Sequence, residues 1–405
     1  MEFIFTFVIS TLIYFEYKLY KTFLNPFIII SGIYLLMIPF NNFFGVRLLD
    51  FYKVDSDSIV YILYFLIIIF LISIFFRLFK KKDANSYTYN IQNYEHNITK
   101  TYSKFILLLF CIGVLAKYIS LFQSINMYGI ENIKGKSFGI FAHIGSLSTI
   151  LLPYTLILYL DNKKKAHYLI LIILVFFNLF LFGGKYNIFI SFIHMIIFYG
   201  IIRNINIRKT LKYVLLTVFV GVLVFIGIYA VKPLITLGYF DKNLFIVSLE
   251  FSVKHFFSYL FGPLISTNYF FHNNIDSIQG ISIMFTVPIN IVKAIFSTGD
   301  YIYPAYTFPV PISDILNTNV GGLFAESVYN SGFLVATIYI TVFFSIVYYF
   351  YNNAMSAGGN IALVAYMLSV ISMMFFGNFL TLSGIVLNFI YLYVIEIILK
   401  KKIVF

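Results

Sequence analysis

The sequence predicts an all-α integral membrane protein with many spanning helices, and three observations support this prediction. Of its 405 residues, 61% are hydrophobic and only 11% are charged, whereas a soluble domain carries about 25% charged residues. Apolar runs long enough to cross a bilayer recur along the chain, and Lys and Arg gather in alternate connecting segments. This composition excludes a cytosolic enzyme, a disordered chain and a disulfide scaffold, since Cys111 is the single cysteine.

Spanning helices are expected where about 18 apolar residues follow one another, because that length crosses a hydrocarbon core of roughly 30 Å. We expect about 11 spans (roughly 10–14) on this criterion. They fall at 2–17, 26–44, 58–76, 105–122, 138–160, 168–182, 187–202, 212–231, 333–351, 360–377 and 379–399. The short sixth and seventh runs meet at Gly183, Gly184 and Lys185, which predicts a tight helical hairpin.

The basic residues predict the orientation of these spans. With the N-terminus outside and the C-terminus in the cytoplasm, 18 of the 28 Lys and Arg lie on the cytoplasmic side, against 5 of the 16 Asp and Glu. This asymmetry follows the positive-inside rule. It accounts for the net charge of +12, so no nucleic-acid partner is expected.

One long segment, 232–332, departs from a plain helical bundle. It holds six of the nine prolines, which a regular helix does not accommodate, and it is rich in Phe, Ile and Tyr. Within a single membrane domain, 1–405, we expect it to form a large outer loop folded against the membrane surface. Apolar residues at helical spacing from Ile246 to Leu260 predict an amphipathic helix in the outer interface within this loop.

Ionisable groups are few inside the predicted spans. Glu16 and Glu396 fall near helix ends, Lys117 falls near the outer end of its span, and His194 is the only readily titrating group well inside a run. Ion-coupled transporters place such groups at mid-membrane depth, so the pattern disfavours ion pumping. The chain also lacks a cysteine cluster, a His-Glu-x-x-His helix, a P-loop and a dinucleotide fingerprint, so no metal and no cofactor are expected.

Several cations on the predicted outer side suit an anionic headgroup. Lys185 follows the Gly183-Gly184 turn, where bare backbone lets a phosphate approach and amide groups donate to it. Lys232 and Lys254 are further cations on this side. The alternative is that the glycines only close a hairpin and the lysines extend to the interface.

Candidate acid–base groups lie in the same outer loop. Histidine side chains such as those of His255 and His272 can orient sugars or act as an acid or a base, although each taken singly is compatible with a structural role. In the segment 317–332, Glu326 stands among amide and hydroxyl side chains and suits a general base that activates a sugar hydroxyl. The alternative is that Asn317 or Thr318 caps a helix and Glu326 lies in its first turns.

These motifs resemble the Wzy family, the repeat-unit polymerases of bacterial O-antigen and capsular polysaccharides. One motif is the glycine turn Phe182-Gly183-Gly184-Lys185, where relatives often carry Gly-x-Arg; lysine keeps the charge but loses the bidentate fork of arginine. The other is the glycine-rich approach to Ala-Glu-x-x-x-Asn-x-Gly, which runs here from Gly321-Gly322 through Ala325-Glu326 and Asn330 to Gly332. The layout of many spans with one large late outer loop is similar as well.

The resemblance implies a metal-independent glycosyltransferase of the bacterial cytoplasmic membrane, with the architecture of the membrane-embedded C-type enzymes. It implies transfer of a growing glycan from undecaprenyl pyrophosphate onto a new lipid-linked oligosaccharide repeat unit at the outer face. Membrane lipids, a chain-length regulator and a flippase are the expected partners. Lys185 and Lys232 would stabilise the pyrophosphate leaving group, and Glu326, His255 or His272 would take the acceptor proton. Further substrate contacts are expected from Lys254, Asn319, Tyr329 and Asn330, and turns from Gly183, Gly184 and Gly332.

Other functions are compatible with the same layout. A flippase of the same lipid-linked oligosaccharide would usually show two similar halves and a cationic cavity within the spans, and the sequence shows neither. An O-antigen ligase shares the predicted layout and chemistry. A polytopic acyltransferase and a structural assembly partner are further alternatives.

Overall fold

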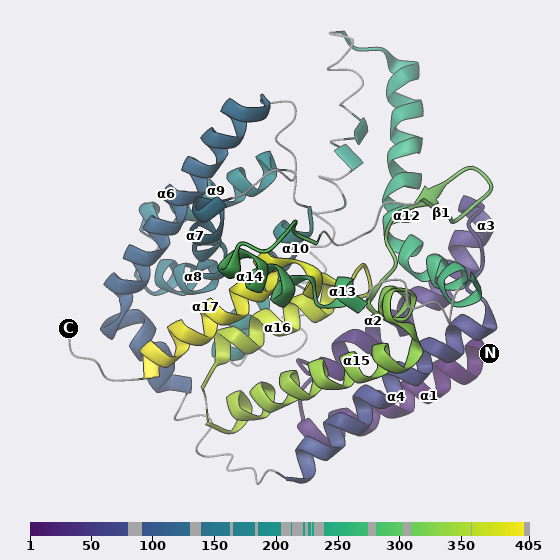
Figure 1. Ribbon diagram of the computed structural model, residues 1–405, viewed down its shortest axis with the longest axis horizontal. Helices are drawn as coiled ribbons and strands as arrows, with labels where there is room; N and C mark the ends of the chain where they lie inside the picture. Colours follow the sequence, from purple (N-terminus) through teal and green to yellow (C-terminus); the bar gives the residue numbers. More distant parts are fainter. Residues whose placement is uncertain are drawn as a thin grey trace. The chain divides into compact units, whose positions relative to one another are not determined.

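A computed structural model describes the helices of this chain and the segments that connect most of them. The described residues are 1–79, 91–129, 139–162, 165–182, 185–203, 212, 222, 226–227, 229–230, 239–273, 281–302, 309–357 and 359–400. The structure is 84% helical, and Figure 1 shows its helices with one short β-hairpin. The all-α prediction is therefore confirmed.

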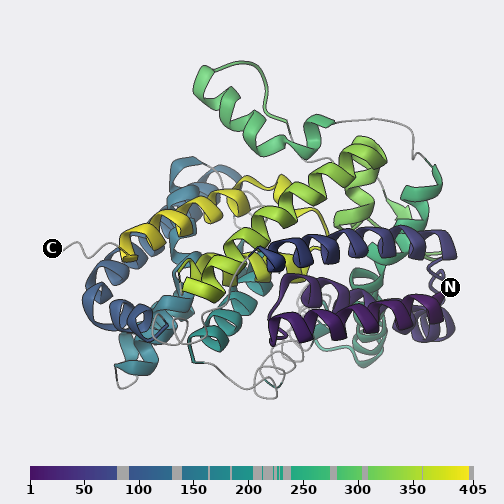
Figure 2. The ribbon, with the colours of Figure 1, turned by 90° about the horizontal axis from the view of Figure 1, so that it is seen from below.

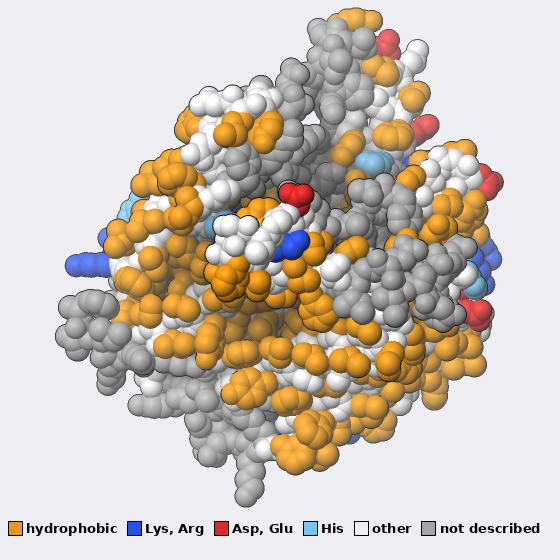
Figure 3. Space-filling model, viewed as in Figure 1, with side chains coloured by type: hydrophobic (Ala, Val, Ile, Leu, Met, Phe, Trp, Pro, Cys, Tyr) orange, Lys and Arg blue, Asp and Glu red, His pale blue; other side chains and the backbone are white. Residues whose placement is uncertain are grey.

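Six of the described helices are long and apolar enough to cross a membrane, or seven if α7 (Gly139–Ile150) and α8 (Leu152–Asp161), which meet at 40°, form one bent span. Large apolar side chains such as Phe3, Leu36 and Leu334 are exposed. On the face drawn in Figure 3, hydrophobic side chains cover most of the described surface and charged ones are sparse. An apolar exterior of this kind suits contact with lipid, and the chain is a multi-pass membrane protein. The number of 11 spans stays a prediction.

The chain folds into two compact units. Unit 1 contains Met1–Phe75, Leu211–Ser345 and Ile371–Thr381, and unit 2 contains Phe76–Thr210, Ile346–Val370 and Leu382–Phe405. Because the chain passes between the units five times, they are not successive domains along the sequence.

Three N-terminal helices of unit 1 run side by side (Figures 1 and 2). They are α1 (Glu2–Tyr20), α2 (Pro26–Phe40), which continues through the π-helical turn η1 (Asn41–Gly45) into α3 (Val46–Leu49), and α4 (Ser56–Leu78). The side chain of Asn25 caps α2 by accepting from the N–H groups of Phe27 and Ile28. Sequence runs of apolar residues thus become helices close to their predicted limits.

The remainder of unit 1 contains helices from the expected outer loop. These are α12 (Lys242–Asn273), α13 (Ile281–Met284), α14 (Thr286–Phe296) and the first part of α15 (Leu323–Ala357), with β1 (Val310–Pro311) paired antiparallel to β2 (Asn317–Thr318). Unit 1 also contains the short 3-10 turn η4 (Phe379–Thr381), which follows later in the chain. Phe324 of α15 stacks on Phe65 of α4, with ring centroids 5.0 Å apart. These contacts join the N-terminal helices to segments far away in the sequence.

The expected surface helix at 246–260 is part of the longer helix α12. This helix has 32 residues and meets the length and hydropathy of a membrane span, so its position in the interface stays a prediction. Contrary to the sequence argument, Pro263 lies inside it. The hydroxyls of Ser266 and Thr267 donate to the Pro263 carbonyl at 3.1 and 3.0 Å.

Unit 2 holds α6 (Ser103–Tyr128), preceded by the π-helical turn η2 (Asn97–Thr101), then α7, α8, α9 (Ala166–Leu181) and α10 (Lys185–Ile202), with parts of α15 and α16 (Ile361–Met373) and α17 (Ser383–Lys400). Helices α6 and α7 pack closely because two glycines face the crossing. A Cβ atom on Gly113 would lie 2.5 Å from the Ser148 nitrogen, and one on Gly145 would lie 3.0 Å from the Lys117 Cα. The span expected at 212–231 and the turn at Gly183-Gly184 lie wholly or mostly outside the described residues.

Candidate functional site

Polar side chains of unit 1 gather where three separate segments meet. Lys53, in the loop after α3, pairs with Glu2 at the start of α1, with 3.0 Å between Nζ and Oε1. Tyr52 in the same loop donates from its hydroxyl to Asp314 Oδ1 of the β-hairpin at 2.9 Å. This hydrogen bond to a carboxylate raises the pKa of Tyr52. The charge pattern assigns all three segments to the outer side, so their meeting agrees with the predicted topology.

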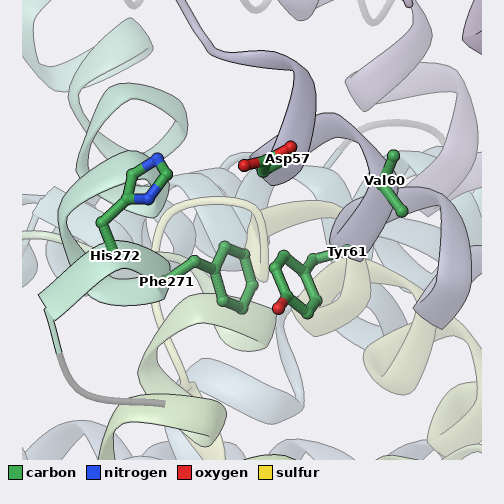
Figure 4. Close-up of a pocket in the computed structure, with 5 residues that line it drawn as sticks. All are labelled: Asp57, Val60, Tyr61, Phe271 and His272. Carbon is green, nitrogen blue, oxygen red and sulfur yellow. The ribbon is translucent and has the colours of Figure 1, made fainter.

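We call the surface around Tyr52, Lys53 and Asp314 the polar face of unit 1. A pocket of about 220 Å³ opens at this face, between the first turns of α4 and the last turn of α12. Asp57, Val60 and Tyr61 line it from α4, and Phe271 and His272 line it from α12. Figure 4 shows Asp57 and His272 on opposite sides, with the rings of Phe271 and Tyr61 next to each other below them. We call it the α4–α12 pocket.

The imidazole of His272 is held by a carboxylate. Its Nε2 lies 2.7 Å from Asp55 Oδ2. The other oxygen of Asp55 accepts from the Ser58 backbone N–H at 2.7 Å and caps α4. Asn268 of α12 fixes the loop by accepting from the Asp55 backbone N–H at 3.2 Å and donating to the Lys53 carbonyl at 2.7 Å. Because Asp55 is fixed on both sides, it can orient the histidine ring and select one tautomer.

His272 is open to solvent while its partner is partly shielded. The exposed fractions of the two side chains are 53% for His272 and 33% for Asp55. Asp57 is exposed as well. A histidine that is oriented by a carboxylate and accessible from a pocket has the arrangement of a general acid or base. The sequence named His272 but missed Asp55 and Asp57, because their proximity depends on α12 packing against the start of α4.

Glu326 lies in a different environment. It stands in the first turn of α15 with an exposed fraction of only 2%. Its carboxylate accepts from the backbone N–H groups of Gly321, at 3.1 Å, and Asn378. The carboxylate thus joins the loop before α15 to the segment after α16, an arrangement that the sequence alone did not indicate.

The glycines before Glu326 are required by close packing. Gly322 has a φ of 73°, and a Cβ atom there would lie 2.6 Å from the Phe375 carbonyl oxygen. A Cβ atom on Gly321 would lie 2.8 Å from the Glu326 Cγ. The glycine-rich motif therefore serves the local packing around Glu326.

The other residues of the same motif lie in differing surroundings. Asn319 is exposed, whereas Asn330 is buried. Tyr329 is half-buried and its ring lies 5.0 Å from that of Phe270 on α12. Gly332 has a φ of 74° and kinks α15. Of these residues, Asn319 and Tyr329 have surface open to a ligand.

His255 and Lys254 occupy another part of α12. The ring of His255 is surrounded by Tyr229, Phe251 and Tyr259, with centroid distances of 4.7, 5.5 and 4.8 Å. The Lys254 Nζ lies 3.9 Å from Asp50 Oδ2. At 1.5 Å per residue, His255 stands roughly 25 Å along the helix from His272. The two histidines therefore do not belong to one site.

The predicted cation cluster cannot be placed from the described residues. Gly183, Gly184 and Lys232 lie outside them, and Lys185 is described only as the first residue of α10. The assignment of Lys185 and Lys232 to a pyrophosphate group stays a prediction.

Unit 2 contains buried ionisable groups, of which Lys117 lies elsewhere than the sequence predicted. Glu396 is fully buried, and its Oε1 accepts from the hydroxyls of Tyr94 and Tyr154 and from the Ala362 backbone N–H at 2.8 Å. Lys117 lies in the middle of α6, eleven residues before its last residue, and donates to Thr149 at 2.7 Å. The expected position near an end of its span was wrong because α6 continues beyond the predicted limit.

His194 and Glu16 are buried too. The Nε2 of His194 lies 3.2 Å from the Ala362 carbonyl oxygen, which is the structural role that a histidine between helices usually has. Glu16 accepts from the Ser73 hydroxyl within unit 1. Both groups are tied to neighbouring helices by hydrogen bonds.

Comparison with known proteins gives no further assignment. No family model matches the chain, and neither a curated protein nor a solved structure matches it. Among the described residues, no group of three or more His, Cys, Asp and Glu could hold a metal ion.

Proposed function

We propose that this chain is a metal-independent glycosyltransferase that polymerises lipid-linked oligosaccharide repeat units at the outer face of the bacterial cytoplasmic membrane. The observation that supports this proposal is the His272–Asp55 pair, 2.7 Å apart, beside a pocket at the polar face of unit 1. A polar substrate on an undecaprenyl-pyrophosphate carrier would present its sugars at the end of the spanning helices, where this pair lies.

His272 is our choice for the general base among the three groups named from the sequence. Glu326 directs its carboxylate to backbone N–H groups, and His255 stands among aromatic rings. His272 combines solvent access with a carboxylate partner. It would take the proton from the acceptor hydroxyl, whose oxygen then attacks the anomeric carbon of the growing chain.

The remaining steps follow from this assignment. The bond between the anomeric carbon and the carrier oxygen breaks, and undecaprenyl pyrophosphate leaves with the electron pair. Lys185 and Lys232 are our candidates for the cations that stabilise the charge on this leaving group. Asp55 orients the His272 ring. Asn319 and Tyr329 are candidates for contacts with the sugars.

A second candidate function is export of the same lipid-linked oligosaccharide. The buried Glu396 and Lys117 of unit 2 support it, because ionisable groups inside membrane helices often mark transport pathways. A ligase that transfers the finished polymer shares the chemistry proposed for His272.

Deletion of the gene in its host separates these functions. Loss of the long surface glycan with single repeat units outside the membrane supports the polymerase. Intermediates trapped on the cytoplasmic side indicate export, and intact polymer left on its carrier indicates a ligase. An unchanged surface glycan and unchanged intermediates would contradict all three.

Complementation with histidine variants then tests the site. We expect His272→Gln to abolish long glycan and His255→Gln, on the same helix, to restore it, at equal amounts of protein in the membrane. Normal polymer with His272→Gln would contradict the assignment of the base.

A further inference from the structure

The α4–α12 pocket is negatively charged. Asp57 forms one wall, and Asp55 lies behind His272 on the other. Within the part of the chain that the structure describes, no cation pairs with Asp57, and Lys53, four positions before it, pairs with Glu2. An entering group therefore meets the carboxylate oxygens of Asp57, which accept hydrogen bonds and repel negative charge.

The floor of the pocket is aromatic. The rings of Tyr61 and Phe271 stack with centroids 4.2 Å apart and planes 21° apart. Phe271 has an exposed fraction of only 1% and supports the ring of Tyr61, which is half-buried and supplies the open aromatic surface. Figure 4 shows both rings below the space between Asp57 and His272. Apolar ring surface beneath polar walls suits a ligand with C–H groups on one side and hydroxyls at its edge.

The shape and charge of this pocket fit one sugar ring. Its volume of about 220 Å³ is smaller than the roughly 300–1,000 Å³ of drug-sized ligand pockets, and it opens on the polar face of unit 1. Sugar hydroxyls donate to carboxylates, and the C–H groups of the ring pack on aromatic side chains. A sugar acid would bring its own carboxylate next to Asp57.

We propose that the α4–α12 pocket binds a single sugar ring that carries no negative charge, with Asp57 accepting from its hydroxyls and the accessible part of Tyr61, held in place by Phe271, packing against its C–H groups. This inference rests on the proposed function, in which the bound ring is the acceptor sugar next to His272. It adds a substrate class: the repeat unit ends in a neutral or amino sugar, and acidic sugars are excluded from this position.

The absence of tryptophan from the chain gives a direct binding assay. Val60→Trp places the only tryptophan at the pocket, and Leu71→Trp, an exposed position on the same helix, is the matched control. The probes are two pairs that differ only in a carboxylate, namely glucose with glucuronic acid and galactose with galacturonic acid. Ligand-observed NMR with the unaltered full-length chain repeats the measurement without an added tryptophan.

We expect a saturable change in the emission of Trp at position 60 with a neutral sugar, at least tenfold weaker binding of its acid, and no change at position 71. Asp57→Asn should weaken binding of the neutral sugar about tenfold and remove the discrimination against the acid. Equal or tighter binding of the acid, or no binding of any probe in either assay, overturns the inference. Polymer synthesis by the unaltered chain is measured separately, so a failure of this inference is distinguishable from a failure of the proposed function.

Discussion

Asp55 uses each of its carboxylate oxygens for a different purpose. One caps α4 through the Ser58 N–H, and the other holds His272. Asparagine caps a helix about as well as aspartate but provides no negative charge for the imidazole. Substitutions at this position therefore separate stability from activity.

We expect Asp55→Asn to lower polymer synthesis at least tenfold with little change in thermal stability. Asp55→Ala should lower activity similarly and also reduce the free energy of unfolding by about 1 kcal/mol, because the cap is lost. Thermal unfolding in detergent and glycan length in complemented cells are the measurements. Full activity of Asp55→Asn would show that the histidine does not need the carboxylate.

Glu326 is expected to act mainly on stability. The two carboxylate oxygens of Glu326 accept from the backbone N–H groups of Gly321 and Asn378. Glutamine keeps the size of the side chain, but its NH2 group replaces one of these oxygens and cannot accept from the N–H group that it faces. A buried donor left without an acceptor costs about 1–3 kcal/mol. We predict that Glu326→Gln lowers the unfolding temperature and the amount of folded protein. Unchanged stability together with lost activity would instead favour a direct catalytic role.

Glu95 gives a prediction about pH. Burial raises its pKa above the usual value of 4.5, Arg203 lowers it in part, and Asp161 raises it. Between pH 4.5 and the raised value, the folded protein binds this proton and the unfolded chain does not. Stability from this group is therefore lost as the pH rises through that interval.

Glu95→Gln should remove this loss. We expect the unfolding temperature of the unaltered chain to fall, relative to that of the variant, as the pH rises from 4.5. Parallel stability curves of the two proteins between pH 4 and 7 would contradict the raised pKa. The comparison cancels the titrating groups that do not interact with Glu95.

At the scale of secondary-structure elements, the crossing of α6 and α7 depends on two glycines, which have no side chain to separate the helices. Gly113 faces the backbone of Ser148, and Gly145 faces that of Lys117. Small residues let membrane helices approach closely, and van der Waals packing then holds them together.

We predict that Gly113→Ala destabilises the protein by about 1–3 kcal/mol, the usual cost of overpacking. Gly32→Ala in α2 is the matched control, because no atom lies within 4 Å of its added Cβ; alanine should be neutral there or stabilising by up to about 1 kcal/mol. Unfolding temperatures of the two variants test this. Equal effects would mean that the crossing is looser than described.

Some elements were predictable from hydropathy and others were not. The runs at 58–76 and 105–122 became α4 and α6 with slightly wider limits, because continuous apolar sequence leaves a membrane chain few alternatives to a helix. Helix α12 was expected only in part, since Lys254, His255 and Pro263 interrupt its apolar character. Lys254 and His255 find partners within unit 1, which no local pattern reveals.

The residues of the candidate site were also predictable from the sequence only in part. His272 and Glu326 were identified by their chemistry, whereas Asp55, Asp57 and Asn378 were not, because they reach the site through packing between distant segments. Tyr94 and Tyr154 were missed as partners of Glu396 for the same reason.

For the whole molecule, the meeting of three distant segments in unit 1 allows a test of topology. In a background with Cys111→Ser, Lys53→Cys and Asp314→Cys place single thiols at the polar face, and Lys165→Cys places one between α8 and α9. We expect a membrane-impermeant maleimide to label the first two in intact cells and the third only after permeabilisation. The opposite pattern would invert the orientation, and labelling of Lys53→Cys and Asp314→Cys from different sides would contradict the contacts of Tyr52 and Lys53.

The division of unit 1 over three stretches of sequence also has a consequence for biosynthesis. The aromatic face of α4 packs against Phe324 and Phe333 of α15, yet roughly 240 residues separate the end of α4 from the start of α15. At about 5–20 residues per second, the ribosome needs on the order of 10–50 s to deliver that partner. During this delay the newly inserted α4 must be covered by lipid or by the insertion machinery, so the surface that later becomes interior first serves as a lipid-facing surface.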